Sequence, residues 1–128
     1  MPGECLEPVL VADPDPRRRE EFRSRAFDAA RMLAAMHRLN PAAIGLRAEP
    51  VVTIKGEIER WVWAYKTSPP HLQFNCTEVG AALVASIPEA VRPTVNHGDY
   101  RLGNTLCLGS RLEASIDWEI WSVGDPRI

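Results

Sequence analysis

Three stretches of the chain carry apolar residues at the three- or four-residue spacing of a helix. The first covers residues 16–39, where Asp15 and Pro16 form a start signal and Asn40-Pro41 forms a stop signal. The spacing and these two signals together predict an amphipathic helix of several turns.

The second and third helical stretches are shorter. Residues 54–66 place isoleucine, valine and aromatic side chains on one face and predict a second helix. A third helix is expected to start after Thr77 and to end at Pro88. Residues 40–53 contain a glycine and two prolines and are predicted to be a loop.

The last third of the chain changes to the alternating pattern of strands. Residues 105–108 and 113–116 alternate, and Gly109-Ser110 between them is a turn signal. Helices are therefore followed by a polar loop and then by a hairpin, which predicts an α+β fold. No internal repeat or linker divides the 128 residues, so we expect one domain.

Composition and charge narrow the class of protein. Hydrophobic residues make up 45% of the chain and charged residues 25%, as in soluble globular proteins. With 15 basic and 17 acidic residues, nucleic acid is not expected as the main partner, because phosphate backbones attract a basic excess. No apolar run could span a bilayer, and the first twenty residues lack a secretory signal. We therefore expect a cytoplasmic protein without a membrane partner.

The arginine run and the cysteines bear on two further kinds of site, an anion site and a disulfide or zinc site. The run Arg17–Arg19 precedes two acidic residues, so it fits either a solvated helix start or an anion site. Cys5, Cys76 and Cys107 are widely spaced and form no C-x-x-C motif. Neither a disulfide framework nor a structural zinc site is supported, and reduced thiols are expected.

The polar loop and the end of the hairpin carry the candidate chemistry. Asp99 and Asn104 lie in the octet HGDYRLGN of residues 97–104, and Asp117 follows the second predicted strand. Because a hairpin brings its two ends together, we expect Asp117 to return beside Asn104. One amide oxygen and two carboxylates would then surround one point. Such oxygens suit Mg²⁺, and a carboxylate that binds no metal can accept a hydroxyl proton.

The same layout occurs in protein kinases, where an H-R-D-x-x-x-x-N loop precedes the metal-binding Asp of D-F-G. Here the octet is followed by Ile116-Asp117-Trp118-Glu119 and then by Gly124-Asp125-Pro126. These motifs, together with LAAMHRLNP at residues 33–41, resemble the aminoglycoside phosphotransferase and choline kinase superfamily. Within it they most resemble the branch related to the kinase domain of acyl-CoA-dehydrogenase-associated proteins.

This resemblance implies a partial kinase-like C-terminal lobe that transfers the γ-phosphoryl group of ATP to a hydroxyl of a small molecule. Asp99 would be the base that accepts the hydroxyl proton. Asn104 and Asp117 would hold Mg²⁺ on the nucleotide phosphates. Aminoglycoside, choline-like and hydroxyacyl substrates are all compatible with the superfamily, and the branch points to a hydroxylated acyl compound by analogy alone.

Arg101 has two interpretations. In protein kinases its position, two residues after Asp99, often carries a cation that meets the transferred phosphoryl group. Alternatively, its guanidinium pairs with a carboxylate such as Asp125 or Glu119. His97 is expected to be a structural residue of the loop.

Two parts of a complete kinase site are missing from the sequence. No G-x-G-x-x-G motif occurs among the eight glycines. The string Val52-Thr53-Ile54-Lys55 resembles the V-A-I-K strand only superficially, because it opens a predicted helix and no Gly-rich strand pair precedes it. We therefore expect residues 1–128 to be a large-lobe fragment without the small nucleotide-clamping lobe.

Two functional classes follow from these observations. The first is an ATP- and Mg²⁺-dependent phosphotransferase, because Asp99, Asn104 and Asp117 are all present. The second is a non-catalytic remnant or interaction module that keeps the lobe and has lost nucleotide binding. We expect the chain alone to bind ATP weakly, to transfer phosphate at a negligible rate and to self-associate through the apolar surface left by the missing lobe.

Overall fold

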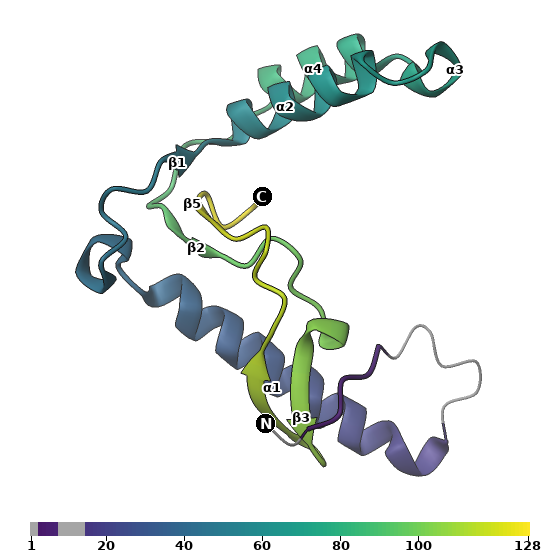
Figure 1. Ribbon diagram of the computed structural model, residues 1–128, viewed down its shortest axis with the longest axis vertical. Coiled ribbons are helices and arrows are strands. Elements are labelled where there is room, and N and C mark those ends of the chain that lie inside the picture. Colours follow the sequence, from purple (N-terminus) through teal and green to yellow (C-terminus); the bar gives the residue numbers. More distant parts are fainter. Residues whose placement is uncertain (1–2, 8–14) are drawn as a thin grey trace. The chain divides into compact units, whose positions relative to one another are not determined.

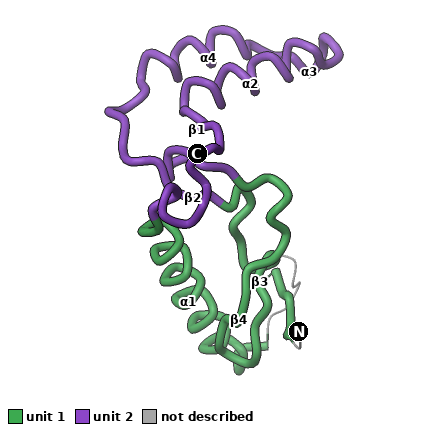
Figure 2. The backbone as a smooth tube through the Cα atoms, turned by 60° about the vertical axis from the view of Figure 1, so that its left-hand side comes forward, with its two compact units in different colours: residues 1–39, 97–121 green, residues 40–96, 122–128 purple. Residues whose placement is uncertain are grey.

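The computed structural model describes residues 3–7 and 15–128, which form helices and short strands (Figure 1). The chain divides into two compact units, each built from segments that are distant in the sequence (Figure 2). Unit 1 consists of residues 1–39 and 97–121, and unit 2 consists of residues 40–96 and 122–128. The predicted α+β class, with three main helices and a hairpin, is confirmed.

Unit 1 begins with helix α1, Arg19–Arg38, which follows a single 3₁₀ turn at Pro16–Arg18. Asp15 caps this turn, because its carboxylate accepts a hydrogen bond from the Arg17 backbone nitrogen at 2.9 Å. The backbone becomes extended at Leu39, two residues before a proline. The helix therefore starts and stops where the sequence predicts.

Strands β3, Thr105–Leu108, and β4, Arg111–Ser115, form the predicted antiparallel hairpin, which packs on α1. The extended segment of residues 3–7 lies against β3. There Glu4 and Cys107 exchange two backbone hydrogen bonds of 2.8 and 2.9 Å. Strand β3 therefore has a backbone partner on both sides.

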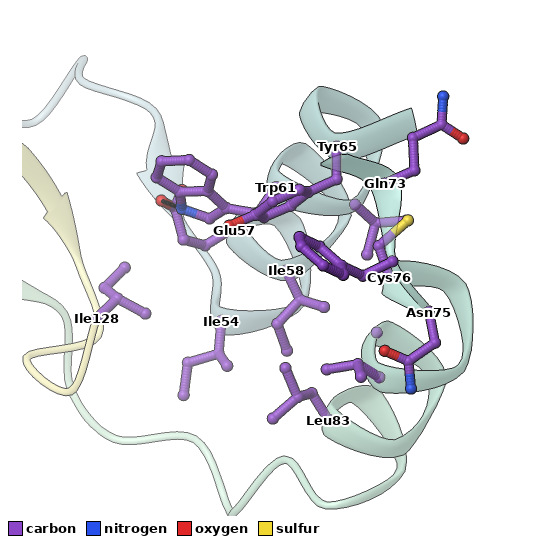
Figure 3. A pocket seen from close by; sticks show the side chains of 14 residues that line it. Ile54, Glu57, Ile58, Trp61, Tyr65, Gln73, Asn75, Cys76, Leu83 and Ile128 are labelled. Atoms are coloured by element: carbon purple, nitrogen blue, oxygen red, sulfur yellow. Dashed lines mark hydrogen bonds between the residues drawn. The ribbon is translucent and has the colours of Figure 1, made fainter. Parts of the chain in front are cut away.

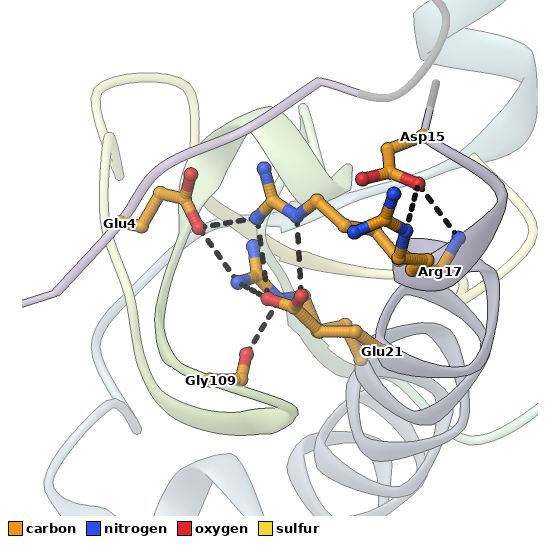
Figure 4. A network of polar contacts seen from close by, with 7 residues as sticks. Glu4, Asp15, Arg17, Glu21 and Gly109 are labelled. Atoms are coloured by element: carbon orange, nitrogen blue, oxygen red, sulfur yellow. Dashed lines mark hydrogen bonds and ion pairs between the residues drawn. The ribbon is translucent and has the colours of Figure 1, made fainter.

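The buried guanidinium of Arg25 ties these parts together (Figure 4). Its Nε donates to the carbonyl of Gly109 in the hairpin turn at 2.7 Å, and its Nη2 donates to Glu4 at 2.7 Å and to Glu21. Arg18, in the middle of the basic run, donates to the same two carboxylates. A buried charge is stable only with such a set of partners. Helix, hairpin turn and N-terminal segment are thus joined.

Unit 2 contains a three-stranded sheet in the order β1–β5–β2. Strand β1, Val51–Val52, runs parallel to β5, Ser122–Gly124, and β2, Thr94–Asn96, runs antiparallel to β5. Just beyond β5, the buried Asp125 accepts hydrogen bonds from the backbone and the guanidinium of Arg127. These contacts anchor the chain that follows β5.

Three helices complete unit 2: α2, Ile54–Lys66, α3, Pro70–Gln73, and α4, Cys76–Ala85. The hydroxyl oxygen of Thr53 caps α2 by accepting a hydrogen bond from the Gly56 backbone nitrogen at 3.0 Å. Helix α2 packs along α4. The two helices therefore shield part of their apolar surface from water, but not all of it.

An apolar groove of about 430 Å³ lies between α2 and α4, with the loop before α4 and Ile128 at its edge (Figure 3). Phe74 and Trp61 line it and are 79% and 52% exposed, and Trp63 nearby is 67% exposed. Unit 2 therefore exposes apolar side chains around this groove. Over the described residues, no helix has the length and apolar character needed to cross a membrane.

Several short elements differ from the sequence-based expectation. Helix α4 begins at Cys76 rather than after Thr77, and it ends at Ala85 rather than at Pro88. The single-turn helix α3 and the sheet of β1, β2 and β5 were not predicted. Strands of two or three residues have no periodic signal, and their partners lie far away in the sequence.

Candidate active site

The predicted catalytic loop is held by the ring of His97, which is 1% exposed. Its Nε2 donates to the Ile116 carbonyl at 2.9 Å, and its Nδ1 accepts from the Asp99 backbone nitrogen at 3.4 Å. The ring also packs against Trp118, with centroids 4.5 Å apart. His97 therefore joins the loop to the segment after the hairpin, and the backbone occupies both of its nitrogens.

Gly98 lets the loop pass close to the same segment. Its φ angle is +89°, and a Cβ atom at this position would lie 2.8 Å from Cγ1 of Ile120 and closer still to the Ile120 carbonyl oxygen. Residues with a side chain rarely adopt this backbone conformation. The glycine of the H-G-D motif is therefore required by the geometry of the loop.

Asp99 and Asn104 meet within the loop. Nδ2 of Asn104 donates to the backbone carbonyl and to Oδ2 of Asp99, each at 2.9 Å. Both acceptors lack a hydrogen, so the amide nitrogen must face Asp99 and the amide oxygen must face away. The side chain of Asn104 is buried, which holds this orientation. Its Oδ1 atom has no protein donor among the described residues.

Asp117 follows directly after the end of the hairpin. Ser115 pairs with Thr105, and the backbone nitrogen of Ile116 donates to the Asn104 carbonyl at 2.9 Å. The hairpin thus returns the chain to Asn104, as expected. The backbone of Asp117 is left-handed, with φ +64°, and its exposed carboxylate pairs with no residue in the described part of the chain. Convergence of the three side chains on one point stays a prediction.

Arg101 pairs with two carboxylates, and one of them was not foreseen. Its Nε donates to Oδ2 of Asp99 and its Nη1 donates to Oε2 of Glu7, both at 3.1 Å. The partners suggested from the sequence, Asp125 and Glu119, are not the ones used. The reason is that the segment of residues 3–7 runs beside β3 and brings Glu7 to the loop.

These hydrogen bonds set the charge state of Asp99. The hydrogen bond from Arg101 and, to a smaller extent, that from Asn104 lower the pKa of Asp99 below its ordinary value. The same bond to Asp99 and a second one to Glu7 raise the pKa of Arg101. At neutral pH the site therefore holds an ionised carboxylate that can accept a proton without first losing one.

The donors available for a metal are an amide oxygen and a carboxylate. Within residues 3–7 and 15–128, no group of three or more His, Cys, Asp or Glu side chains could hold a metal ion. Asn104 and Asp117 instead offer two hard oxygens. These fit Mg²⁺, which keeps several waters and completes its shell with substrate phosphates.

Lys55 is not placed as a kinase lysine. It lies in the first turn of α2, and its ammonium is 3.7 Å from the carboxylate of Glu59. The side chain is 62% exposed. Because the kinase lysine is carried by a strand, the helical position of Lys55 agrees with the sequence-based rejection of the V-A-I-K string.

Comparison with known proteins confirms the class that the fold and the loop define. The model of the phosphotransferase enzyme family, APH, matches residues 3–128, so the chain belongs to this family. The chain is also similar to the crystal structure of a "putative aminoglycoside phosphotransferase" from Ralstonia eutropha, at 29% identity and a TM-score of 0.79 over 98% of this chain. It spans 39% of that protein's length. Comparison with curated proteins gave no match.

Sequence reasoning did not single out the two acids of the N-terminal segment, Glu4 and Glu7. They lie before the first predicted helix, in a stretch for which no helix or strand is predicted. A signal was nevertheless present, since two carboxylates interrupt an otherwise apolar segment at a spacing of three. In an extended backbone that spacing places them on opposite faces, where each can meet a different arginine.

Proposed function

We propose that this sequence carries the acceptor-activating and metal-binding part of an ATP- and Mg²⁺-dependent phosphotransferase. The enzyme would move the γ-phosphoryl group to a hydroxyl of a small molecule. The observation that carries the proposal is the Asn104 amide, whose nitrogen donates to Asp99 and whose oxygen faces away and is free to bind a metal ion. Membership of the phosphotransferase family supports the class of reaction.

Asp99 would act on the acceptor. Its ionised carboxylate takes the proton of the substrate hydroxyl while that oxygen bonds to the γ-phosphorus and the bond to the β-phosphate oxygen breaks, which releases ADP. The lowered pKa of Asp99 makes it a weaker base. Phosphoryl transfer tolerates this, because its loose transition state depends more on positioning and charge stabilisation than on early proton removal.

Asn104 and Asp117 would hold the Mg²⁺ ion through Oδ1 and the carboxylate. When bound, Mg²⁺ would supply positive charge that stabilises the negative charge developing on the nucleotide phosphates. With two protein ligands, most of the coordination shell is left to water and phosphate. We therefore expect this pair to bind the ion weakly without nucleotide.

Arg101 would meet the transferred phosphoryl group. A guanidinium has five N–H donors, and the pairs with Asp99 and Glu7 use Nε and Nη1. Nη2 therefore has no partner among the described residues. The side chain is 47% exposed, so an incoming phosphoryl oxygen can reach it.

The acceptor would be a small alcohol rather than a nucleic acid or a membrane. The similar Ralstonia protein is described as a "putative aminoglycoside phosphotransferase", which makes an aminoglycoside hydroxyl one candidate. Choline-like alcohols and hydroxyacyl compounds are the others. Because ATP is the proposed donor, we place the reaction in the cytoplasm.

Paramagnetic Mn²⁺, added with ATP to the isotope-labelled chain, tests the metal assignment by NMR. Mn²⁺ accepts the same oxygen ligands as Mg²⁺. The side-chain amide signal of Asn104 and the backbone amide of Asp117 should broaden first. Asp117→Ala should abolish this broadening, whereas Glu20→Gln on the exposed face of α1 should preserve it. Broadening that is centred elsewhere and survives Asp117→Ala would refute the assignment.

A further inference from the structure

The N-terminal segment of residues 3–7 is anchored through two carboxylates that face opposite ways. Glu4 accepts hydrogen bonds from Arg18 of the 3₁₀ turn before α1 and from Arg25 of α1. Glu7 instead contacts the candidate active site. The two ends of the same short segment therefore have different partners, one in the helix and one in the catalytic loop.

Glu7 contacts the loop twice through one oxygen. Its Oε2 accepts from Nη1 of Arg101 at 3.1 Å and from the backbone nitrogen of Gly103 at 3.2 Å. The side chain of Glu7 is 18% exposed. An ion pair that is partly shielded and shares its oxygen with a backbone donor is held more firmly than a pair on the open surface.

The segment also holds the other side of the Gly103 residue. The thiol of Cys5 donates to the Gly103 carbonyl, while Glu7 accepts from the Gly103 nitrogen. A Cβ atom at residue 103 would lie 2.9 Å from Oε2 of Glu7 and closer still to Nη1 of Arg101. Both backbone groups of the residue that precedes Asn104 are thus fixed by the N-terminal segment, and a side chain at residue 103 would displace the ends of Glu7 and Arg101 from their present positions.

Arg101 depends on this arrangement. Apart from Glu7, its one partner in the described part of the chain is Asp99, through a single bond of 3.1 Å. One contact is a weak restraint on a long side chain that is half exposed, because holding it in place costs rotamer entropy. Two carboxylates on different guanidinium nitrogens fix both its position and its plane.

We propose that Glu7 is a positioning residue of the phosphotransferase site, which holds the guanidinium of Arg101 beside Asp99 and fixes the Gly103 turn that leads into Asn104. The roles of Asp99 and Arg101 in this inference rest on the proposed function. The contacts themselves do not, and they can be tested without turnover.

Hydrogen exchange of two NMR signals, the Gly103 backbone amide and the Arg101 Nη1 protons, which both donate to Glu7, tests the proposal on the 128-residue chain. Glu7→Ala removes both contacts and should speed exchange of both signals at least about tenfold, because each group loses a hydrogen bond to a charged acceptor. Glu7→Gln keeps the length and an acceptor oxygen but loses the charge. It should leave the Gly103 amide protected and release the Arg101 signal.

Two control variants separate positioning from general stability. Glu20→Gln removes an exposed carboxylate of α1 and should change neither signal. Glu4→Gln weakens the other anchor of the segment and should lower Tm. It should not release the Arg101 signal while the Gly103 amide stays protected, which is the pattern expected of Glu7→Gln. Equal effects of Glu4→Gln and Glu7→Gln on both signals, or no effect of Glu7→Ala, would overturn the proposal.

Turnover gives a second, separate measurement in a phosphotransferase that contains this sequence. Glu7→Gln should lower kcat about tenfold with little change in the KM for ATP. The reason is that a displaced Arg101 guanidinium stabilises the charge of the transition state less well. The effect should vanish in an Arg101→Ala background. If the unmodified enzyme transfers no phosphate, the proposed function fails and hydrogen exchange alone decides the contacts of Glu7. Unchanged turnover in Glu7→Ala would overturn its positioning role.

Discussion

The side-chain nitrogen of Asn104 lies 2.9 Å from Oδ2 of Asp99 and equally close to the Asp99 backbone carbonyl. The amide cannot rotate without losing both bonds and turning its oxygen onto two acceptors. One residue therefore orients the proposed base and, by the same contact, directs its own oxygen to the other side. The two proposed roles of the loop, proton acceptance and metal binding, are geometrically linked.

Asn104→Asp should destabilise the chain, because it replaces a donor by a carboxylate that faces two acceptors. We expect the free energy of unfolding to fall by about 1–3 kcal/mol, measured by urea denaturation. Asn75→Asp is the matched control, since Asn75 is exposed and its side chain caps no helix. That variant should change stability by about 0.5 kcal/mol or less. Similar losses in both would show that the Asn104 contacts are unimportant.

Asp99→Asn and Asp117→Ala should separate base from metal ligand in a phosphotransferase that contains this sequence. Loss of a general base costs on the order of 10²–10⁴ in rate. Asp99→Asn should therefore remove nearly all turnover and leave nucleotide affinity little changed. Asp117→Ala should weaken binding of Mg-ATP itself, measured by isothermal titration. A parallel loss of affinity and turnover in Asp99→Asn would point to metal binding or structure instead.

Gly98→Ala should cost more stability than Gly109→Ala. Both glycines have positive φ angles, but only position 98 lacks room for a Cβ atom, whereas nothing lies within 4 Å of one at position 109. The left-handed backbone alone costs about 1–2 kcal/mol for an alanine. Gly109→Ala should show about that loss in Tm measurements converted to free energy, and Gly98→Ala a larger one. An equal cost would mean that Ile120 moves aside freely.

Acid should weaken unit 1 through the carboxylates around Arg25. The hydrogen bond from Arg25 and then that from Arg18 lower the pKa of Glu4, and the hydrogen bond from Arg18 lowers the pKa of Glu21. A carboxylate whose pKa is lower in the folded state adds stability above its unfolded pKa of about 4.5, and this stability is lost as the pH falls through the folded pKa.

Thermal unfolding between pH 7 and pH 3 measures this loss. Tm should be nearly constant down to about pH 5 and then fall. In Glu4→Gln the fall should be smaller, because the amide has no proton to bind in this range, while Tm at pH 7 is already reduced. An identical acid profile in Glu4→Gln and the unmodified chain would show that the Arg25 network contributes nothing to the pH dependence.

The exposed apolar face of α2 and α4 should make the chain associate with itself. Sedimentation velocity is expected to show an average mass that rises with concentration, because apolar patches of this kind favour association. Trp63→Glu combined with Phe74→Glu, both strongly exposed positions, should reduce it. Leu108→Glu, an exposed apolar position of unit 1, is the control. Association that responds only to Leu108→Glu would place the contact surface elsewhere.

Local signals made much of the fold predictable. Helices α1 and α2 were predictable from their apolar spacing, and α1 also from the start signal at Asp15 and the stop signal at Asn40-Pro41. The hairpin was predictable from the alternation of apolar and polar residues on both sides of Gly109. Short elements such as α3 and β1 were not predictable, because a two- to four-residue element has too few positions to show a period.

The sequence by itself determined the family, the long elements and the order of Asp99, Asn104 and Asp117, because each of these follows from residues that are close together in the sequence. Only the tertiary structure decided which carboxylates meet Arg101 and which way the Asn104 amide faces. Glu7 reaches Arg101 because residues 3–7 add to the edge of β3, a pairing between segments about a hundred residues apart. Such contacts depend on how distant segments pack, and no local pattern of residue types encodes them.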